Sequence, residues 1–285
     1  MQTSDDFKEK PLNIFDSHCH LNDRAYDKDR GAVIENAAAA GVRKMMIVGI
    51  TEKTCKQAIE IAEAYQGCYA SVGIHPHDAA SCSEKTLAAL KEMARNPKVK
   101  AWGETGLDFN RMYSPADIQE KWFVRQMEAA GELDLPLIFH ERDSQGRFAE
   151  LIHTRAPKGI QGVVHCFSGT SEELHQYLDM GFYIGITGIL TISKRGAALR
   201  QMAETIPEDR LLIETDAPYL TPAPEKNQTR RNEPAFVKRV LTKLAEVRNT
   251  DARDLARSLW DNTCRLFDIN DAGPAIQSVK KENLQ

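Results

Sequence analysis

The sequence has no long hydrophobic run, since no window approaches the roughly 18 consecutive apolar residues that a membrane-spanning helix needs. Its first ten residues, MQTSDDFKEK, are polar and lack the apolar centre of a secretory signal peptide. It also lacks internal repeats and low-complexity linkers. We therefore expect a cytoplasmic protein without membrane contacts.

Cysteine pairs and an excess of positive charge are missing too. The six cysteines form no Cys-x-x-Cys pair and no small-domain disulfide framework, which is typical of a reducing compartment. A formal net charge of −4 argues against a protein that coats nucleic acid with a basic surface. It does not exclude an enzyme that handles phosphates locally, because bound divalent ions would offset a carboxylate-rich site. No exposed apolar stripe stands out, so we expect a monomer.

What the sequence does contain is a regular series of short, nearly continuous apolar runs. Between them lie helix-like stretches such as 51–65 and 83–95, with apolar residues at helical spacing. This rhythm, in a chain of 285 residues with 42% hydrophobic residues, predicts a single parallel (β/α)8 barrel of the TIM type. An open doubly wound sheet is the alternative. The predicted strands are 13–17, 44–48, 69–73, 99–103, 137–139, 162–164, 182–186 and 211–213.

We place the barrel at residues 13–268, between a polar lead, 1–12, and a polar tail, 269–285. Metal-capable side chains follow several of the predicted strands. His18 and His20 follow the first strand and, one residue apart, point to the same side of it, within reach of one metal ion. The C-terminal ends of barrel strands meet at one mouth, so such residues predict a common metal centre there. The later candidates are Glu104, His140, His165 and Asp216.

Several motifs also occur together in one order along the chain. They are FDSHCHL at 15–21, GIHPH at 73–77, GETGLD at 103–108, His140 with Arg142, HCFSG at 165–169, ETDAPY at 214–219 and RNEP at 231–234. In these motifs the chain resembles the TatD family of metal-dependent deoxyribonucleases, within the amidohydrolase-like metal-dependent hydrolases. It departs from the family pattern at Thr105, where an aliphatic residue is usual, and at 143–146, which replaces a segment that often carries another histidine. The second departure affects expected substrate contacts and spares the ligands.

The resemblance implies two divalent ions that share one bridging carboxylate, Glu104. Two ions roughly 3.5–4 Å apart can activate a water and stabilise charge on a scissile phosphate. We expect Mg²⁺ or Mn²⁺ in use, and Zn²⁺ as a metal that the purified protein could carry. The remaining ligands would divide into His18, His20 and Asp216 for one ion, and His140 and His165 for the other.

Three residues have candidate roles beside the ligands. Asp216 is our candidate general base, because a carboxylate is ionised at neutral pH, although it could serve as a ligand only. His75, in the His-Pro-His turn, is expected near the site, where it would orient loops, donate a hydrogen bond to a ligand or contact phosphate. Asp108 either hydrogen-bonds a ligand histidine or caps a loop.

Substrate contacts are expected from loops that follow the predicted strands. Tyr219 either stacks on a base or sugar, or forms a wall of the pocket. The phosphate-binding candidates are basic residues in or near such loops, namely Arg111, Arg142, Lys194 and Arg231.

The function we expect is hydrolysis of DNA phosphodiester bonds, as a 3′-5′ exonuclease on single-stranded or frayed ends. The family resemblance suggests it, and a narrow barrel mouth favours a DNA end over a duplex interior. The alternative is a metal-dependent amide or ester hydrolase, such as an aminoacyl-tRNA deacylase or a cyclic amidase. Many of those relatives bridge their metals with a modified lysine, whereas Glu104 stands here. A third interpretation is a non-catalytic scaffold that a metal stabilises. The expected pair of metal ions, bridged by a carboxylate and open to water, argues against it, because structural zinc sites are closed by four protein ligands.

Overall fold

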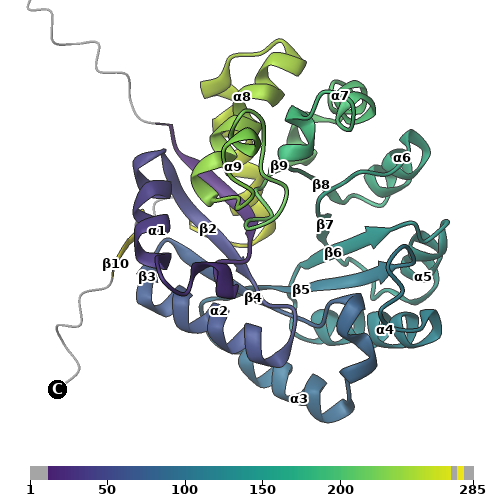
Figure 1. The fold of residues 1–285 in the computed structure, drawn as a ribbon. Coiled ribbons are helices and arrows are strands. Elements are labelled where there is room, and N and C mark those ends of the chain that lie inside the picture. Colours follow the sequence, from purple (N-terminus) through teal and green to yellow (C-terminus); the bar gives the residue numbers. More distant parts are fainter. Residues whose placement is uncertain (1–11, 271–274, 279–285) are drawn as a thin grey trace, which may run out of the picture.

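The computed structural model describes residues 12–270 and 275–278. Its centre is an eight-stranded parallel sheet rolled into a nearly closed barrel, with helices around the outside (Figure 1). Strand order follows the chain, so the predicted (β/α)8 barrel is confirmed. The barrel strands are β1 (Ile14–Cys19), β2 (Val42–Val48), β4 (Cys68–Val72), β5 (Val99–Asp108), β6 (Leu137–Arg142), β7 (Gly162–Val164), β8 (Tyr183–Ile186) and β9 (Leu211–Ile213).

The helices alternate with the strands, and several of them begin at polar caps. Thr51 accepts a hydrogen bond from the Thr54 amide at the start of α2, and Ser83 accepts one from Thr86 at the start of α3. Both helices match the predicted stretches 51–65 and 83–95. The α-helices are α1 (Arg30–Ala39), α2 (Glu52–Ala64), α3 (Glu84–Met93), α4 (Ala116–Glu132), α5 (Arg147–Arg155), α6 (Ser171–Asp179), α7 (Ala197–Ala203), α8 (Val237–Arg248) and α9 (Ala252–Leu266). Short 3₁₀ helices are η1 (Arg24–Tyr26), η2 (Pro76–Ser81), η3 (Gly188–Thr191), η4 (Glu208–Arg210), η5 (Glu225–Asn227) and η6 (Pro234–Phe236).

Two apolar layers hold the barrel together. One lies between the strands and the outer helices, and the other fills the barrel interior. The interior layer includes Phe15 of β1, which contacts the rings of Trp260 and Phe267 at centroid distances of 6.0 and 6.4 Å. The C-terminal part of α9 therefore seals the barrel at the end where the strands begin, and the chemistry is left to the opposite end.

Three strands run further than the sequence indicated, because strand pairing continues after the apolar run stops. β1 extends to Cys19, β5 to Asp108 and β6 to Arg142. Along β5, Gly103 pairs with Ile138 and Thr105 pairs with Phe139, so Glu104 is the extra residue of a β-bulge. The candidate ligands His18, Glu104 and His140 thus lie within the strand ends, whereas His20 is the first residue after β1.

Gly106 makes the extension of β5 sterically feasible. Its φ is +149°, which L side chains rarely adopt, and a Cβ placed there would lie 1.9 Å from the carbonyl oxygen of His140. Only glycine therefore allows β5 and β6 to stay paired beside the bulge.

The barrel closes between β1 and the segment after β9. Cys19 and Ala217 form a parallel bridge, and the Asp216 amide donates to the His18 carbonyl at 2.9 Å. Asp16, which is fully buried, accepts hydrogen bonds from the Thr215 amide at 2.8 Å and the Thr215 hydroxyl at 2.6 Å. These contacts fix Asp216 against the histidines of β1.

The described part of the predicted polar tail packs on the barrel. Ile276 is buried, and its amide donates to the Arg43 carbonyl at 3.0 Å. β10 (Gln277–Ser278) pairs antiparallel with β3 (Tyr65–Gln66). The rest of the tail, 271–274 and 279–285, and residues 1–11 of the lead lie outside the described residues. Within the described ranges, the model contains no helix with the length and apolar character of a membrane span.

Candidate metal centre

The first of two adjacent groups of candidate ligands comes from β1 and the end of β9. The Nε2 atoms of His18 and His20 lie 3.2 Å apart. The Oδ1 atom of Asp216 lies 3.4 Å from Nε2 of His20 and 3.8 Å from Nε2 of His18. The structure therefore brings together the three residues that the sequence assigned to one ion.

The second group joins β5, β6 and the turn after β4. Oε1 of Glu104 lies 2.8 Å from Nδ1 of His140 and 3.3 Å from Nε2 of His75. The same two histidine nitrogens lie 3.2 Å from each other. His75, which the sequence placed only near the site, is thus a full member of this group.

Glu104, a member of the second group, also faces the first. Its Oε2 atom lies 3.5 Å from Nε2 of His18 and 3.7 Å from Nε2 of His20, while Oε1 faces the second group. The side chain is only 4% exposed. Separate oxygens directed at separate groups form the arrangement that a bridging carboxylate needs.

His165 occupies the space between the groups. Its Nε2 atom lies 3.7 Å from Oε1 of Glu104 and 3.9 Å from Oδ1 of Asp216. Its ring stacks on that of His18, with centroids 3.6 Å apart. The sequence paired His140 with His165. In the structure His75 is the histidine in contact with His140, and His165 lies near carboxylates of both groups.

The donor set suits a divalent cation. Imidazole nitrogens and carboxylate oxygens converge so that the ligand atoms of each group lie within 4.8 Å of one another. Zn²⁺ and Mn²⁺ accept such mixed nitrogen and oxygen ligands. The residues present therefore fit a divalent metal ion.

The charges of the carboxylates and histidines are mutually dependent. Burial opposes ionisation of Glu104 and Asp216, but the nearby histidines outweigh it and lower the pKa of both carboxyl groups. Burial also opposes protonation of His140, yet Asp108 and Glu104 raise the pKa of that imidazole to about 9. His75, where burial dominates, has its pKa lowered to about 4.

Asp108 performs both of the roles considered for it. Its Oδ2 atom lies 3.1 Å from Nε2 of His140 and 2.8 Å from Nε2 of His77. Its Oδ1 atom accepts hydrogen bonds from the amides of Asn110 at 3.0 Å and Arg111 at 2.7 Å. One carboxylate thus orients a candidate ligand and holds the loop after β5.

Glu214 supports His165 and was missed by the sequence reasoning. Its Oε1 atom lies 2.8 Å from Nδ1 of His165 and accepts a hydrogen bond from the Cys166 amide at 2.6 Å. A signal was available: Glu214 precedes Asp216 by two residues, and residues two apart in an extended segment share a side.

The expected substrate-contacting residues differ in their surroundings. Tyr219 is half exposed, and its ring lies 5.9 Å from that of His20. Arg231 is engaged elsewhere, because Nη1 and Nη2 contact the Asp29 carboxylate at 2.9 and 2.7 Å and Nη2 also contacts Glu233 at 2.9 Å. We therefore revise its expected phosphate role to a structural one. The remaining basic candidates have exposed side chains: Arg111, Arg142 and Lys194.

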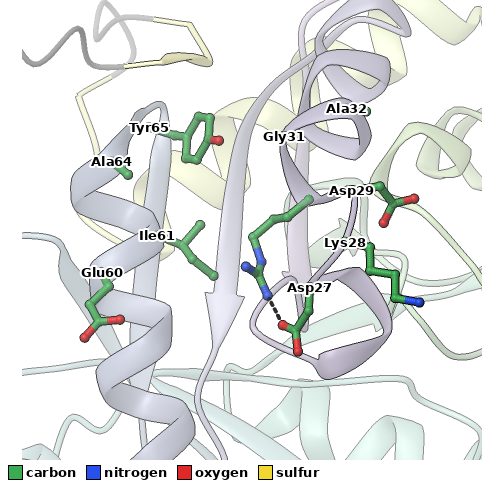
Figure 2. A pocket seen from close by; sticks show the side chains of 10 residues that line it. Asp27, Lys28, Asp29, Gly31, Ala32, Glu60, Ile61, Ala64 and Tyr65 are labelled. Carbon is green, nitrogen blue, oxygen red and sulfur yellow. Dashed lines mark hydrogen bonds and ion pairs between the residues drawn. The ribbon is translucent and has the colours of Figure 1, made fainter.

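A surface cavity of about 630 Å³ lies away from these groups, between α1 and α2 (Figure 2). Arg30 pairs with Asp27 there at 2.8 Å. Glu60 and Tyr65 also line it, but none of the candidate ligands does. The candidate site is therefore the barrel mouth and not this cavity.

A (β/α)8 barrel whose strand ends gather histidines and carboxylates in this way has the architecture of a metal-dependent hydrolase. The family model described as TatD related DNase matches residues 15–268. The chain belongs to this family.

Individual relatives align over nearly the whole chain. A Rahnella protein named 3′-5′ ssDNA/RNA exonuclease TatD is 42% identical over 260 residues, which is 90% of this chain and 99% of that protein. The Bacillus subtilis protein YabD, described as an uncharacterized metal-dependent hydrolase, is 39% identical, covering 90% and 100%. The crystal structure of YJJV, a TatD homolog from Escherichia coli, superposes with a TM-score of 0.83 at 31% identity, covering 90% and 98%.

Proposed function

We propose that this protein is a divalent-metal-dependent 3′-5′ exonuclease that removes nucleotides from single-stranded DNA or frayed DNA ends. The structural observation that supports it most is Glu104, whose two oxygens face two groups of potential metal ligands. The names of the relatives supply the polarity and the substrate class. An aligned relative of the same family thus supports the same reaction in this chain.

We assign one ion to His18, His20 and Asp216. We assign the other ion to His140, with His75 and His165 as candidates for its further ligands. Glu104 would be shared by both. When bound, divalent ions supply Lewis-acid stabilisation of charge on the phosphate and lower the pKa of a coordinated water. Mg²⁺ or Mn²⁺ is the metal that we expect to support activity.

Asp216 is our candidate for the proton acceptor. Its side chain is 13% exposed, whereas that of Glu104 is 4% exposed and surrounded by histidines. Asp216 is therefore the more accessible of the two carboxylates to a water at the mouth. We assign phosphate contacts to Arg142, which is exposed at the end of β6, and to Arg111, which is exposed in the loop after β5.

The direct test is cleavage of a 5′-labelled single-stranded oligonucleotide by metal-loaded protein. We expect a ladder of products that shorten from the 3′ end with Mg²⁺ or Mn²⁺, and none with chelator-treated protein. Restoring metal to the chelated sample should restore the ladder, which separates metal loss from denaturation. No cleavage by folded, metal-loaded protein would contradict the proposal and leave the amide and ester hydrolases as the class to test.

A Glu214→Gln variant is expected to bind the metal about 10 to 100 times more weakly, because a carboxylate beside a ligand histidine orients it and raises its basicity. Glutamine keeps the size of the side chain, while the charge facing Nδ1 of His165 is lost. Isothermal titration of the metal-free protein with Mn²⁺ measures the change. The control is Glu173→Gln, which removes a carboxylate from the exposed capping box of α6. Equal Mn²⁺ affinity in native protein and Glu214→Gln would show that Glu214 does not support a ligand.

A further inference from the structure

The large hydrophobic side chains that are exposed in the described part of the chain gather in two loops at the barrel mouth. They are Met112, 46% exposed, Tyr113, 66% exposed, and Tyr219, 51% exposed. The first two lie in the loop between β5 and α4, and the third lies three residues after Asp216. Scattered exposed apolar residues are ordinary on a protein surface, but confinement to the rim of one site is not.

Tyr113 lies beside the second group of candidate ligands. Its ring is 4.7 Å from that of His77, at an interplanar angle of 67°. The His77 ring in turn lies 4.3 Å from the ring of His75. The contact with His77 is edge-to-face, so a large part of the Tyr113 ring stays open to solvent, in agreement with the 66% exposure of this residue.

The loop that carries Tyr113 is anchored on both sides of it. On one side, Asp108 accepts the Arg111 amide at 2.7 Å. On the other, the buried Ser114 donates its hydroxyl to the His77 carbonyl at 2.9 Å and accepts the Ala80 amide at 2.9 Å. Because the loop backbone is already held on both sides of Tyr113, stacking of a ligand on this ring costs little ordering of the loop.

Tyr219 lies beside the first group and is similarly fixed. Its amide donates to the Asp216 carbonyl at 2.8 Å, and its carbonyl accepts from Nδ2 of Asn232 at 2.7 Å. Its ring lies 5.9 Å from that of His20, at 70°. Each of the two ligand groups that flank Glu104 therefore has one anchored, exposed tyrosine.

We infer that Tyr113 and Tyr219 form a pair of base-stacking platforms, one on each side of Glu104, that receive the two bases flanking the scissile phosphate. The inference rests on the proposed function and extends it, because sequence alone suggested stacking only for Tyr219. Aromatic side chains bind single-stranded DNA without reading its sequence, because every base has a π-face. Bases inside a duplex have both faces covered by neighbours, so the platforms select unpaired ends.

The test compares native protein, Tyr113→Ala and Tyr113→Phe on a single-stranded substrate and on the same strand with abasic sites at the last two positions. On the normal strand we expect Tyr113→Ala to raise KM about 10-fold, within the range that loss of one stacked base produces, with kcat within about 2-fold. Tyr113→Phe keeps the ring and should match native protein. On the abasic strand, all three should have the same KM.

An unchanged KM for Tyr113→Ala on the normal strand would overturn the inference. So would an equal loss of kcat on both strands, because it would mean that Tyr113 acts only by holding His77. Binding to a strand with a non-hydrolysable methylphosphonate as its last linkage, measured by fluorescence anisotropy, separates this inference from the proposed function. If native protein cleaves no DNA, the proposed function fails, and the Kd of Tyr113→Ala for that strand then decides for or against the platform.

Discussion

Replacing Glu104 with glutamine is expected to lower kcat for DNA hydrolysis at least about 1000-fold, equivalent to roughly 4 kcal/mol of transition-state stabilisation. The substitution keeps the shape of the side chain but removes the charge that faces both ligand groups. Glu104 is almost fully enclosed, so no solvent ion can replace that charge. Initial rates on a 5′-labelled single strand, with saturating Mn²⁺, measure the loss.

Glu141→Gln is the matched control for Glu104→Gln. Glu141 follows the candidate ligand His140 on β6, but its carboxylate accepts hydrogen bonds from the amide and hydroxyl of Ser144, at 3.0 and 2.7 Å. The Glu141→Gln variant should keep its activity within about 3-fold of the native value, as expected for a change away from the reacting groups. If Glu104→Gln is folded by circular dichroism and keeps more than a tenth of native kcat, the bridging role is wrong.

The fold could be predicted from sequence because a parallel barrel leaves a strong signal in it. Strands that are buried on both faces appear as short apolar runs, and several of the helices between them begin at a polar cap such as Thr51 or Ser83. The ends of β5 and β6 were not predictable from that signal, because their last residues are polar. Those residues stay in the strands because they pair with each other at the mouth.

The candidate site was predictable only as a set of residues at strand ends. That His18 and His20 act together follows from their spacing alone. The close contact of His75 with His140 does not, because it depends on how the turn after β4 packs against β6. Nor does the position of Glu104 within a bulge, which depends on pairing with a strand more than 30 residues away.

Ion pairs between residues far apart in the sequence could not be predicted either. Arg231 is a basic residue in a loop near the mouth, and sequence position favoured a phosphate contact for it. In the structure it binds Asp29, which is 202 residues away along the chain. No local pattern encodes such a partner, so sequence position alone cannot tell which basic residues are engaged by a distant carboxylate.

Asp16→Ala is expected to destabilise the protein by about 2–5 kcal/mol, because it removes the acceptor of the buried Thr215 amide and the shorter of the two hydrogen bonds of the Thr215 hydroxyl, which keeps only the His18 carbonyl at 3.5 Å. For a chain of 285 residues, this corresponds to a fall in Tm of roughly 3–8 °C. Differential scanning fluorimetry measures it. The control, Asp29→Ala, removes an aspartate that also joins distant segments, through Arg231. The Asp29 side chain is 41% exposed, so loss of its ion pair should change Tm little.

Asp16→Ala should also lower the activity of the folded protein about 10- to 100-fold, because displacement of a reacting group by about 1 Å costs this much. Thr215 is bonded to Asp16 and immediately precedes Asp216, so the closure of the barrel and the position of the candidate base depend on the same two hydrogen bonds. Rates measured well below the Tm of the variant separate the two effects. A lower Tm with native kcat would show that Asp16 closes the barrel without positioning Asp216.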